Sequence, residues 1–101
     1  MKFISAILFA IVMIISIPAQ ADKAAGQSAY AAKGCIGCHG AGGKSVVPTY
    51  PSLKGRSAGF VRKNLTDFRS GARKNPTMNA MAAGLSDADI KNIADYIGSL
   101  K

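Results

Sequence analysis

The chain has 101 residues, with 13 lysine and arginine residues against 5 acidic ones, so its formal net charge is +8 at pH 7. This length excludes two full-sized domains and leaves room for a single small core. Basic chains often bind nucleic acid, but the interleaved aromatic side chains on which bases stack are absent here. We therefore expect no nucleic-acid partner. The charge is either a solvated surface or a means of steering toward acidic proteins and anionic membranes.

A secretory signal peptide is predicted over residues 1–21. Met1-Lys2 forms a short basic start, an apolar run extends from Phe3 to Ile17, and an Ala-x-Ala site ends at Ala21. The run falls short of the roughly 20 apolar residues of a membrane-spanning helix, which makes a retained anchor the weaker interpretation. We expect cleavage after Ala21 and a periplasmic location. Cleavage removes one charged residue, Lys2, so the net charge falls from +8 for the full chain to +7 for the remaining domain, residues 22–101.

An alanine-rich stretch from Lys23 to Lys33 predicts a short helix that leads into Cys35-Ile36-Gly37-Cys38-His39. This motif contains both cysteines and the one histidine of the chain. Cys-x-x-Cys-His is the attachment pattern of a c-type haem. One helical turn brings two thiols to the two vinyl groups of one porphyrin edge, and the next residue places its imidazole beneath the iron. We therefore predict one covalently bound haem c on Cys35 and Cys38, with His39 as an iron ligand.

Two other kinds of site use similar residues. A Cys-x-x-Cys pair occurs in thiol oxidoreductases, but no alternating apolar run predicts the strands that such a scaffold requires. A zinc site needs a fourth ligand, and no Cys or His remains beyond Cys35, Cys38 and His39. Haem attachment is therefore the preferred interpretation. A core of about 80 residues is marginal, so we expect the haem to complete it.

Two loops and two helices are predicted after the motif. Pro48 and Pro51 favour an extended loop over residues 46–55 that wraps over the haem. Helical spacing of apolar residues predicts a helix over residues 57–70, with Ser57 as its N-cap. Asn75-Pro76 is expected to break helical structure, which predicts a second loop over residues 72–85.

The last helix is predicted to begin after Ser86. Ser86 and Asp89 have the spacing of a capping box, and an apolar stripe follows from Ile90 to Ile97.

The sixth coordination position of the iron requires a second ligand. A second histidine is excluded because His39 is the only one, and the domain after the leader contains two methionines, Met78 and Met81. Met78 follows Pro76, whose fixed φ would hold the loop rigid before the metal. Met81 lies closer to the last helix, where an apolar side chain more naturally packs into the core. We assign Met78 as the distal ligand and Met81 as the alternative.

Taken together, the motifs resemble a small class I cytochrome c of the bacterial periplasm, especially one domain of the dihaem cytochromes c. The resemblance covers nearly all of residues 22–101 and rests on four segments: 35–39, 51–55, 75–78 and 85–90. It implies an all-α fold of three to four short helices and long loops around one covalently attached haem.

The resemblance also implies roles for residues outside the motif. The Pro51 carbonyl would accept a hydrogen bond from His39, and Leu53 would pack on the haem. The first helix would cross the last where Gly26 and Tyr30 meet Ile93 and Tyr96.

With both axial positions filled, the iron has no site for a substrate, so we expect single-electron transfer and no enzymatic activity. Methionine opposite histidine raises the reduction potential. Expected partners are an oxidase, a reductase or a dehydrogenase with an acidic docking surface, and peripheral association with an anionic membrane is a further option. The alternative role is that of the haem-bearing subunit of a dehydrogenase complex. Six cations near the expected haem edge form a predicted docking patch: Lys33, Lys44, Lys54, Arg56, Arg73 and Lys74.

Overall fold

The computed structural model describes the backbone of residues 19–101 and the side chains of residues 23–101. Within that part the secondary structure is entirely helical, with no strand: α1 (Ala19–Ala32), α2 (Cys35–His39), the 3₁₀ turn η1 (Ala41–Gly43), α3 (Ala58–Ser70), α4 (Pro76–Ala83) and α5 (Asp87–Gly98). None of the described helices is long and apolar enough to span a bilayer. Most of the predicted signal peptide lies outside the described residues, so cleavage after Ala21 stays a prediction.

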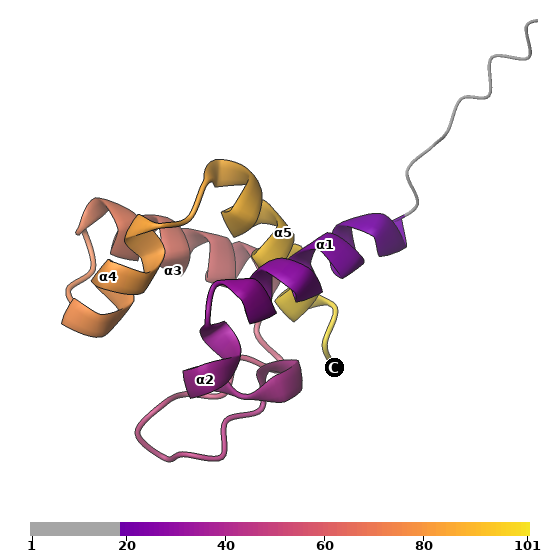
Figure 1. Cartoon of the computed structure of the whole chain (residues 1–101), viewed down its shortest axis with the longest axis horizontal. Helices are drawn as coiled ribbons and strands as arrows, with labels where there is room; N and C mark the ends of the chain where they lie inside the picture. The colour runs from indigo at the N-terminus through magenta and orange to yellow at the C-terminus, as the bar shows by residue number, and fades with distance from the viewer. Residues whose placement is uncertain (1–18) are drawn as a thin grey trace, which may run out of the picture.

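Helices α1 and α5 cross in close contact, and α3 packs against both α5 and α4 (Figure 1). The crossing involves Gly26 and Tyr30, as expected. A Cβ on Gly26 would lie only 2.6 Å from the Cβ of Tyr96, and the Tyr30 and Tyr96 rings have centroids 5.5 Å apart. The absence of a side chain at Gly26 is therefore what allows the two backbones to approach.

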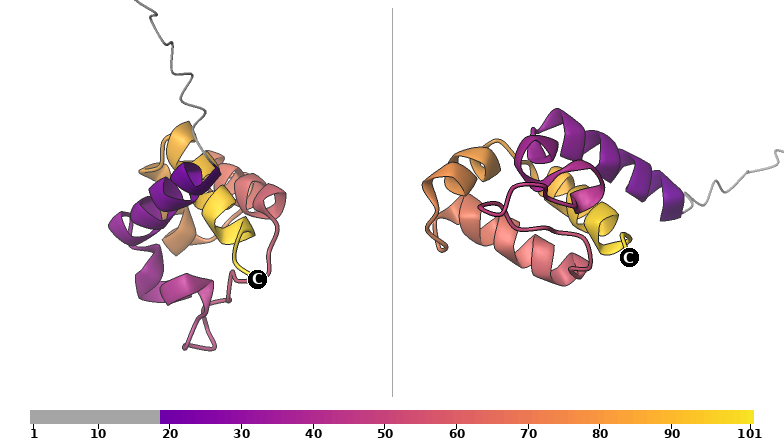
Figure 2. Two further views of the ribbon diagram at one scale, coloured as in Figure 1. Left: turned by 90° about the vertical axis from the view of Figure 1, so that its right-hand side faces the viewer. Right: turned by 90° about the horizontal axis from the view of Figure 1, so that it is seen from below.

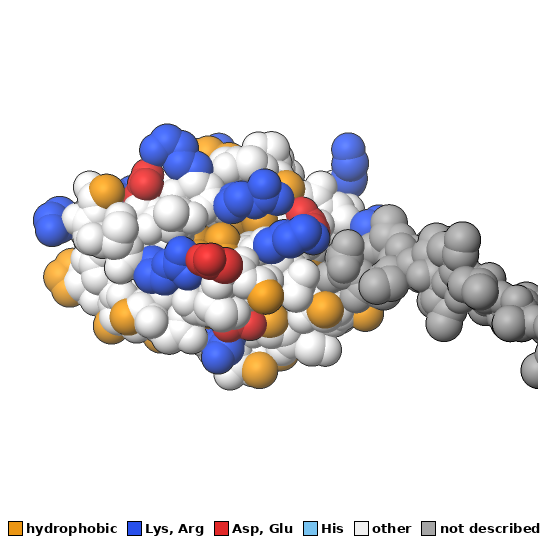
Figure 3. Space-filling view, turned by 90° about the horizontal axis from the view of Figure 1, so that it is seen from above, with side chains coloured by type: hydrophobic (Ala, Val, Ile, Leu, Met, Phe, Trp, Pro, Cys, Tyr) orange, Lys and Arg blue, Asp and Glu red, His pale blue; other side chains and the backbone are white. Residues whose placement is uncertain are grey.

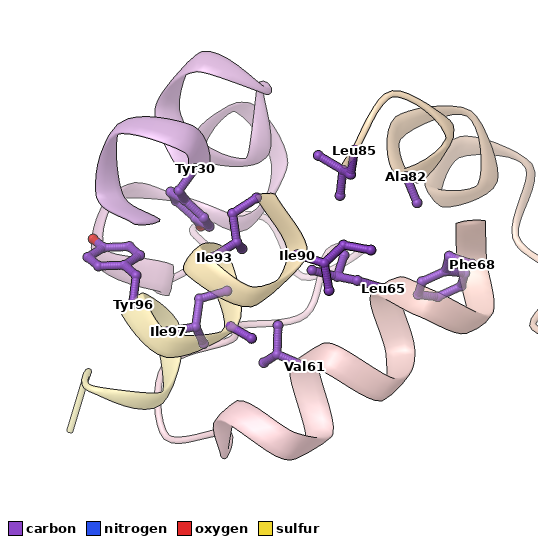
Figure 4. Packing of buried hydrophobic residues seen from close by; sticks show 11 residues of the cluster. Tyr30, Val61, Leu65, Phe68, Ala82, Leu85, Ile90, Ile93, Tyr96 and Ile97 are labelled. Atoms are coloured by element: carbon purple, nitrogen blue, oxygen red, sulfur yellow. The ribbon is translucent and has the colours of Figure 1, made fainter. Parts of the chain in front are cut away.

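The hydrophobic core lies between α1, α3, α4 and α5 (Figure 4). Its buried members include the apolar stripes predicted for the last two helices: Tyr30, Val61, Leu65, Phe68, Ala82, Leu85, Ile90, Ile93, Ala94, Tyr96 and Ile97. The caps are also as predicted. The Ser57 side chain accepts a hydrogen bond from the Phe60 N–H, and Ser86 and Asp89 form a reciprocal capping box.

The prediction of a structureless loop over residues 72–85 is wrong, because α4 occupies Pro76–Ala83. Pro76 stands at the first helical position, where its missing N–H costs nothing and its fixed φ favours the helix. The side chain of Asn75 caps this helix by accepting a hydrogen bond from the Met78 N–H. The described chain therefore has five α-helices, where three to four were expected.

The surface around α3 and α5 carries paired charges. Figure 3 shows acidic side chains lying beside lysine and arginine on this face. The four aspartates whose side chains are described all form ion pairs: Asp89 with Lys33, Asp67 with Lys63, Asp87 with Arg69, and Asp95 with both Arg62 and Lys91. Exposed pairs of this kind contribute little stability, but they cancel much of the positive charge on this side.

Candidate functional site

A cavity of about 600 Å³ is enclosed by α2, the following loop, and the inner sides of α3 and α4. Figure 2 (right) shows the loop of residues 44–57 running across the molecule from α2 to the start of α3. Most lining side chains are apolar or aromatic, and the volume falls within the range of small-molecule and cofactor sites, roughly 300–1,000 Å³. The lining includes all six predicted site residues and the alternative ligand Met81: Cys35, Cys38, His39, Pro51, Leu53, Met78 and Met81.

Helix α2 presents the two cysteines to this cavity. Cys35 and Cys38 are three residues apart on one helical turn, so both thiols reach the same space, and neither forms a disulfide. Gly40 ends the helix at a φ of 85°, and a side chain there would collide with the Lys44 carbonyl group. This exit turns the chain sharply after His39 and directs the loop over the cavity.

His39 is held by one hydrogen bond and is largely buried, with 8% of its surface exposed. Its Nδ1 lies 2.7 Å from the Pro51 carbonyl oxygen. A carbonyl only accepts, so Nδ1 carries the proton and Nε2 keeps its lone pair. A metal-binding histidine is commonly oriented in this way by a partner on its other nitrogen.

Helix α4 brings both methionines to the cavity. Met78 and Met81 are three residues apart and therefore share one side of the helix. Met78 is half-buried and packs against the core. The expectation that Met81 packs into the core is wrong, because its side chain is 39% exposed and lies near Gly34 at the mouth of α2.

Asn79, which the sequence did not single out, fixes the position of α4. Its Nδ2 donates to the Phe68 and Arg73 carbonyls at 2.8 Å each, and its Oδ1 accepts from the Asn75 N–H at 2.9 Å. These bonds join the end of α3, the connecting turn and the start of α4. Asn79 therefore sets where the neighbouring Met78 enters the cavity.

Tyr30 links the α1–α5 crossing to the motif. Its hydroxyl donates to the Gly40 carbonyl at 2.7 Å, directly after His39. Burial, together with the nearby Cys35 and Tyr96, raises the pKa of the Tyr30 hydroxyl, so this donor keeps its proton at physiological pH. The sequence indicated Tyr30 only as a packing residue.

Burial also raises the pKa of the Cys35 thiol. Redox-active cysteines need the opposite shift, because the thiolate is the nucleophile. Among the described residues, no group of three or more His, Cys, Asp or Glu side chains is placed to hold a metal ion. Neither observation favours the thiol oxidoreductase or the zinc site as an interpretation of Cys35-Ile36-Gly37-Cys38-His39.

The arrangement suits a covalently attached haem. Two thiols one turn apart, an imidazole with a free Nε2, and a methionine from another helix all border one largely apolar cavity. An all-helical fold over residues 19–101 that assembles this donor set has the design of a c-type cytochrome.

Comparison with known proteins supports that class. A family model for cytochrome c matches residues 23–101, and the chain therefore belongs to the cytochrome c family. It is 41% identical over 81 residues to cytochrome c-554(548) of Halomonas halodenitrificans, covering 77% of this chain and 95% of that protein. It is 45% identical over 83 residues to the thiosulfate dehydrogenase electron acceptor of Stutzerimonas stutzeri, covering 74% of this chain and 38% of that protein.

A solved structure has the same fold. The crystal structure of reduced recombinant cytochrome c4 from Pseudomonas stutzeri matches with a TM-score of 0.73 and 33% identity, over 81% of this chain and 50% of that chain. This chain therefore spans about half of that protein, although it spans nearly all of cytochrome c-554(548). As a member of the family, it is an electron-transfer protein with covalently bound haem c.

Proposed function

We propose that the chain is an exported monohaem carrier, attached to its haem through Cys35 and Cys38, with His39 and Met78 as the axial iron ligands. The observation that carries this proposal is the cavity that these four side chains share. When bound, the haem supplies one-electron Fe(II)/Fe(III) chemistry. Axial ligands that both come from the chain leave no coordination position for a substrate.

Each residue then has a definite task. The Pro51 carbonyl fixes the His39 ring and increases the basicity of Nε2. Leu53, with the buried Ile93 and Ile97, forms apolar walls that limit the access of water. Low polarity and a methionine ligand both favour the reduced state, so we expect a positive reduction potential.

Paired substitutions test the axial ligand. Met78→Ala should abolish the weak near-infrared iron–sulfur absorption of the oxidised protein, and Met81→Ala should leave it intact. The two residues share one side of α4, so Met81→Ala is a matched control for a change in helix packing. Loss of the band in Met81→Ala alone would reverse the assignment.

Unpaired cations support a role in docking acidic partners. Of the predicted patch, Lys33 forms an ion pair with Asp89 at 3.7 Å. Lys44, Lys54 and Lys74 have no carboxylate partner among the described residues. Lys54 and Lys74 are next in sequence to residues that line the cavity, and Lys44 lies in the chain between the lining residues His39 and Thr49. We call these three the docking lysines. They fit a redox protein with an acidic surface, and long-range attraction by them should weaken with salt.

An electrode coated with a carboxylate-terminated monolayer provides a defined acidic surface for this test. Adsorption of the holoprotein should fall steeply with ionic strength and should weaken when the docking lysines are replaced by glutamine. Lys63→Gln is the matched control, because Lys63 already pairs with Asp67 at 2.7 Å. Equal losses in the control and the docking variants would remove the docking assignment.

The export route has its own test. N-terminal sequencing of holoprotein from the periplasmic fraction should begin at Asp22. A protein that retains Met1, or that accumulates with the cytoplasmic fraction, would contradict export.

In a second candidate role, the chain works with one particular dehydrogenase, either as its electron acceptor or as its haem-bearing subunit. It is favoured by the 45% identity to a protein named as the electron acceptor of thiosulfate dehydrogenase. Co-purification of the tagged holoprotein with a dehydrogenase subunit would support this role, whereas a chain that purifies alone and exchanges electrons with several acceptors would support a free shuttle.

A further inference from the structure

The cavity has a charge composition that the axial ligands do not explain. Among the side chains that the structure describes, Arg56 and Arg73 are the only lysine or arginine residues in its lining, and no aspartate or glutamate lines it. Neither arginine has a carboxylate partner within the described part of the chain. A haem brings two propionate carboxylates into this space.

Both guanidinium groups are held against aromatic rings that also line the cavity. Arg56 lies over the Phe60 ring at 5.1 Å, and Arg73 lies over the Phe68 ring at 4.8 Å, measured to the ring centroids. Phe60 and Phe68 are eight residues apart on α3, and both line the cavity. The two arginines are therefore placed at the two ends of one wall.

Stacking leaves the donors of each guanidinium available in the plane of the group. Arginine has five N–H donors, and Arg73 uses one of them on the Asn64 side-chain oxygen. Asn64 also donates to the Phe60 carbonyl at 2.8 Å, which fixes its orientation. The geometry thus presents two oriented cations with unused donors to a cavity that lacks anions of its own.

We propose that Arg56 and Arg73 bind the two haem propionates through charge-assisted hydrogen bonds. Planar guanidinium forks match carboxylates in a way that ammonium groups do not. The propionates then neutralise the two arginines, and attraction of acidic partners falls to the docking lysines. This inference rests on the haem that the family carries and is independent of which partner the protein serves.

The neighbouring docking lysines supply matched controls. Lys54 lies two residues from Arg56 and Lys74 is next to Arg73, yet neither lysine lines the cavity. The variants Arg56→Gln, Arg73→Gln, Lys54→Gln and Lys74→Gln all remove one positive charge from the same regions. A general electrostatic effect would act similarly in all four, whereas direct pairing would separate the arginines from the lysines.

The experiment measures the pKa of each propionate by ¹³C NMR titration of holoprotein whose haem carboxyl carbons are labelled. An opposite charge in direct contact lowers a carboxyl pKa by about 1–3 units. Each arginine variant should therefore raise one propionate pKa by about one unit or more, and the lysine variants should shift it much less. The other titratable groups lining the cavity are Tyr30, Cys35, Cys38, His39 and Tyr50.

Arg56→Lys and Arg73→Lys keep the charge and lose the planar fork, which protects the test if a glutamine variant fails to retain haem. They should give smaller upward shifts in the same propionate. Propionate pKa values that are equal in the arginine and lysine variants would overturn the proposal. If replacing the docking lysines had no specific effect on adsorption to the carboxylate electrode, these pKa values would be unaffected. The docking proposal and the propionate proposal can therefore fail separately.

Discussion

The crossing of α1 and α5 has no room for a side chain at Gly26. A Cβ at this position would lie 2.6 Å from the Tyr96 Cβ and closer still to the Asn92 carbonyl oxygen, whereas real Cβ contacts do not fall below 3.0 Å. The Asn92 contact is a backbone atom, and the Tyr96 contact is the first carbon of the tyrosine side chain. Neither can rotate away, so Gly26→Ala must push the helices apart.

The expected cost follows from these rigid contacts. Overpacking a tight site costs about 1–3 kcal/mol, and the absence of a flexible neighbour places this site near about 3 kcal/mol. Alanine returns up to about 1 kcal/mol in helix propensity, which leaves a net loss of about 2 kcal/mol. For a domain of this size, that loss corresponds to a decrease of about 8–16 °C in Tm.

Gly59→Ala is the control, because it makes the same chemical change on α3 at a site with no atom within 4 Å. It should raise stability by about 0.5–1 kcal/mol through reduced backbone entropy of the unfolded chain. Thermal unfolding of both holoproteins, followed by circular dichroism, gives the comparison. If Gly26→Ala melts with or above Gly59→Ala, the α1–α5 contact does not have the tightness described.

Three further substitutions address single interactions. Tyr30→Phe removes the donor to the Gly40 carbonyl and should lower the unfolding free energy in urea by about 1–3 kcal/mol. Asn79→Asp removes the Nδ2 donors but keeps an acceptor, so the near-infrared iron–sulfur band should disappear at a lower temperature than in the parent protein. The hydrogen bond from the Ser86 N–H lowers the pKa of Asp89 from 3.8, so the folded state binds protons less readily than the unfolded state. Stability from this carboxylate is then present above pH 3.8 and is lost as pH falls through the folded pKa. Asp89→Asn should lack this acid-dependent component in unfolding titrations.

Each of these results can be contradicted. An unchanged urea midpoint in Tyr30→Phe would mean that water replaces the lost hydroxyl without cost. Identical melting of the iron–sulfur band in Asn79→Asp would separate Asn79 from the position of Met78. Parallel acid titrations of Asp89→Asn and the parent protein would show that the capping carboxylate does not couple to folding.

Short-range patterns predicted much of this molecule. The cap at Ser57, the capping box of Ser86 and Asp89, and the two apolar stripes depend on residues three or four apart, so the sequence contains their partners. The sequence does not predict helix α4, because Asn75-Pro76 indicates a break in helical structure. In the structure Asn75 is instead the N-cap and Pro76 the first helical residue. The same dipeptide can therefore end one helix or begin the next, and only the path of the chain after it distinguishes the two.

The residues that support the site were less predictable because their partners are distant in sequence. Tyr30 reaches Gly40 ten residues away, and Asn79 reaches Phe68 eleven residues away. The stacking of Arg73 on Phe68 depends on the turn after α3. Composition and periodicity contain no information on such contacts, whereas the His39–Pro51 bond was expected because the resemblance implied it.

The size of the cavity bears on what holds the fold together. An empty space in a core costs about 24 cal/mol per Å³, so about 600 Å³ corresponds to roughly 14 kcal/mol as an upper bound. That figure matches the whole stability of a typical domain, about 5–15 kcal/mol. We therefore expect the chain without haem to be largely unfolded. A Cys35→Ala/Cys38→Ala double variant, purified free of haem, should show little helical circular dichroism and no cooperative thermal transition. A native-like helical spectrum that melts cooperatively would mean that α1, α3 and α5 close the core by themselves.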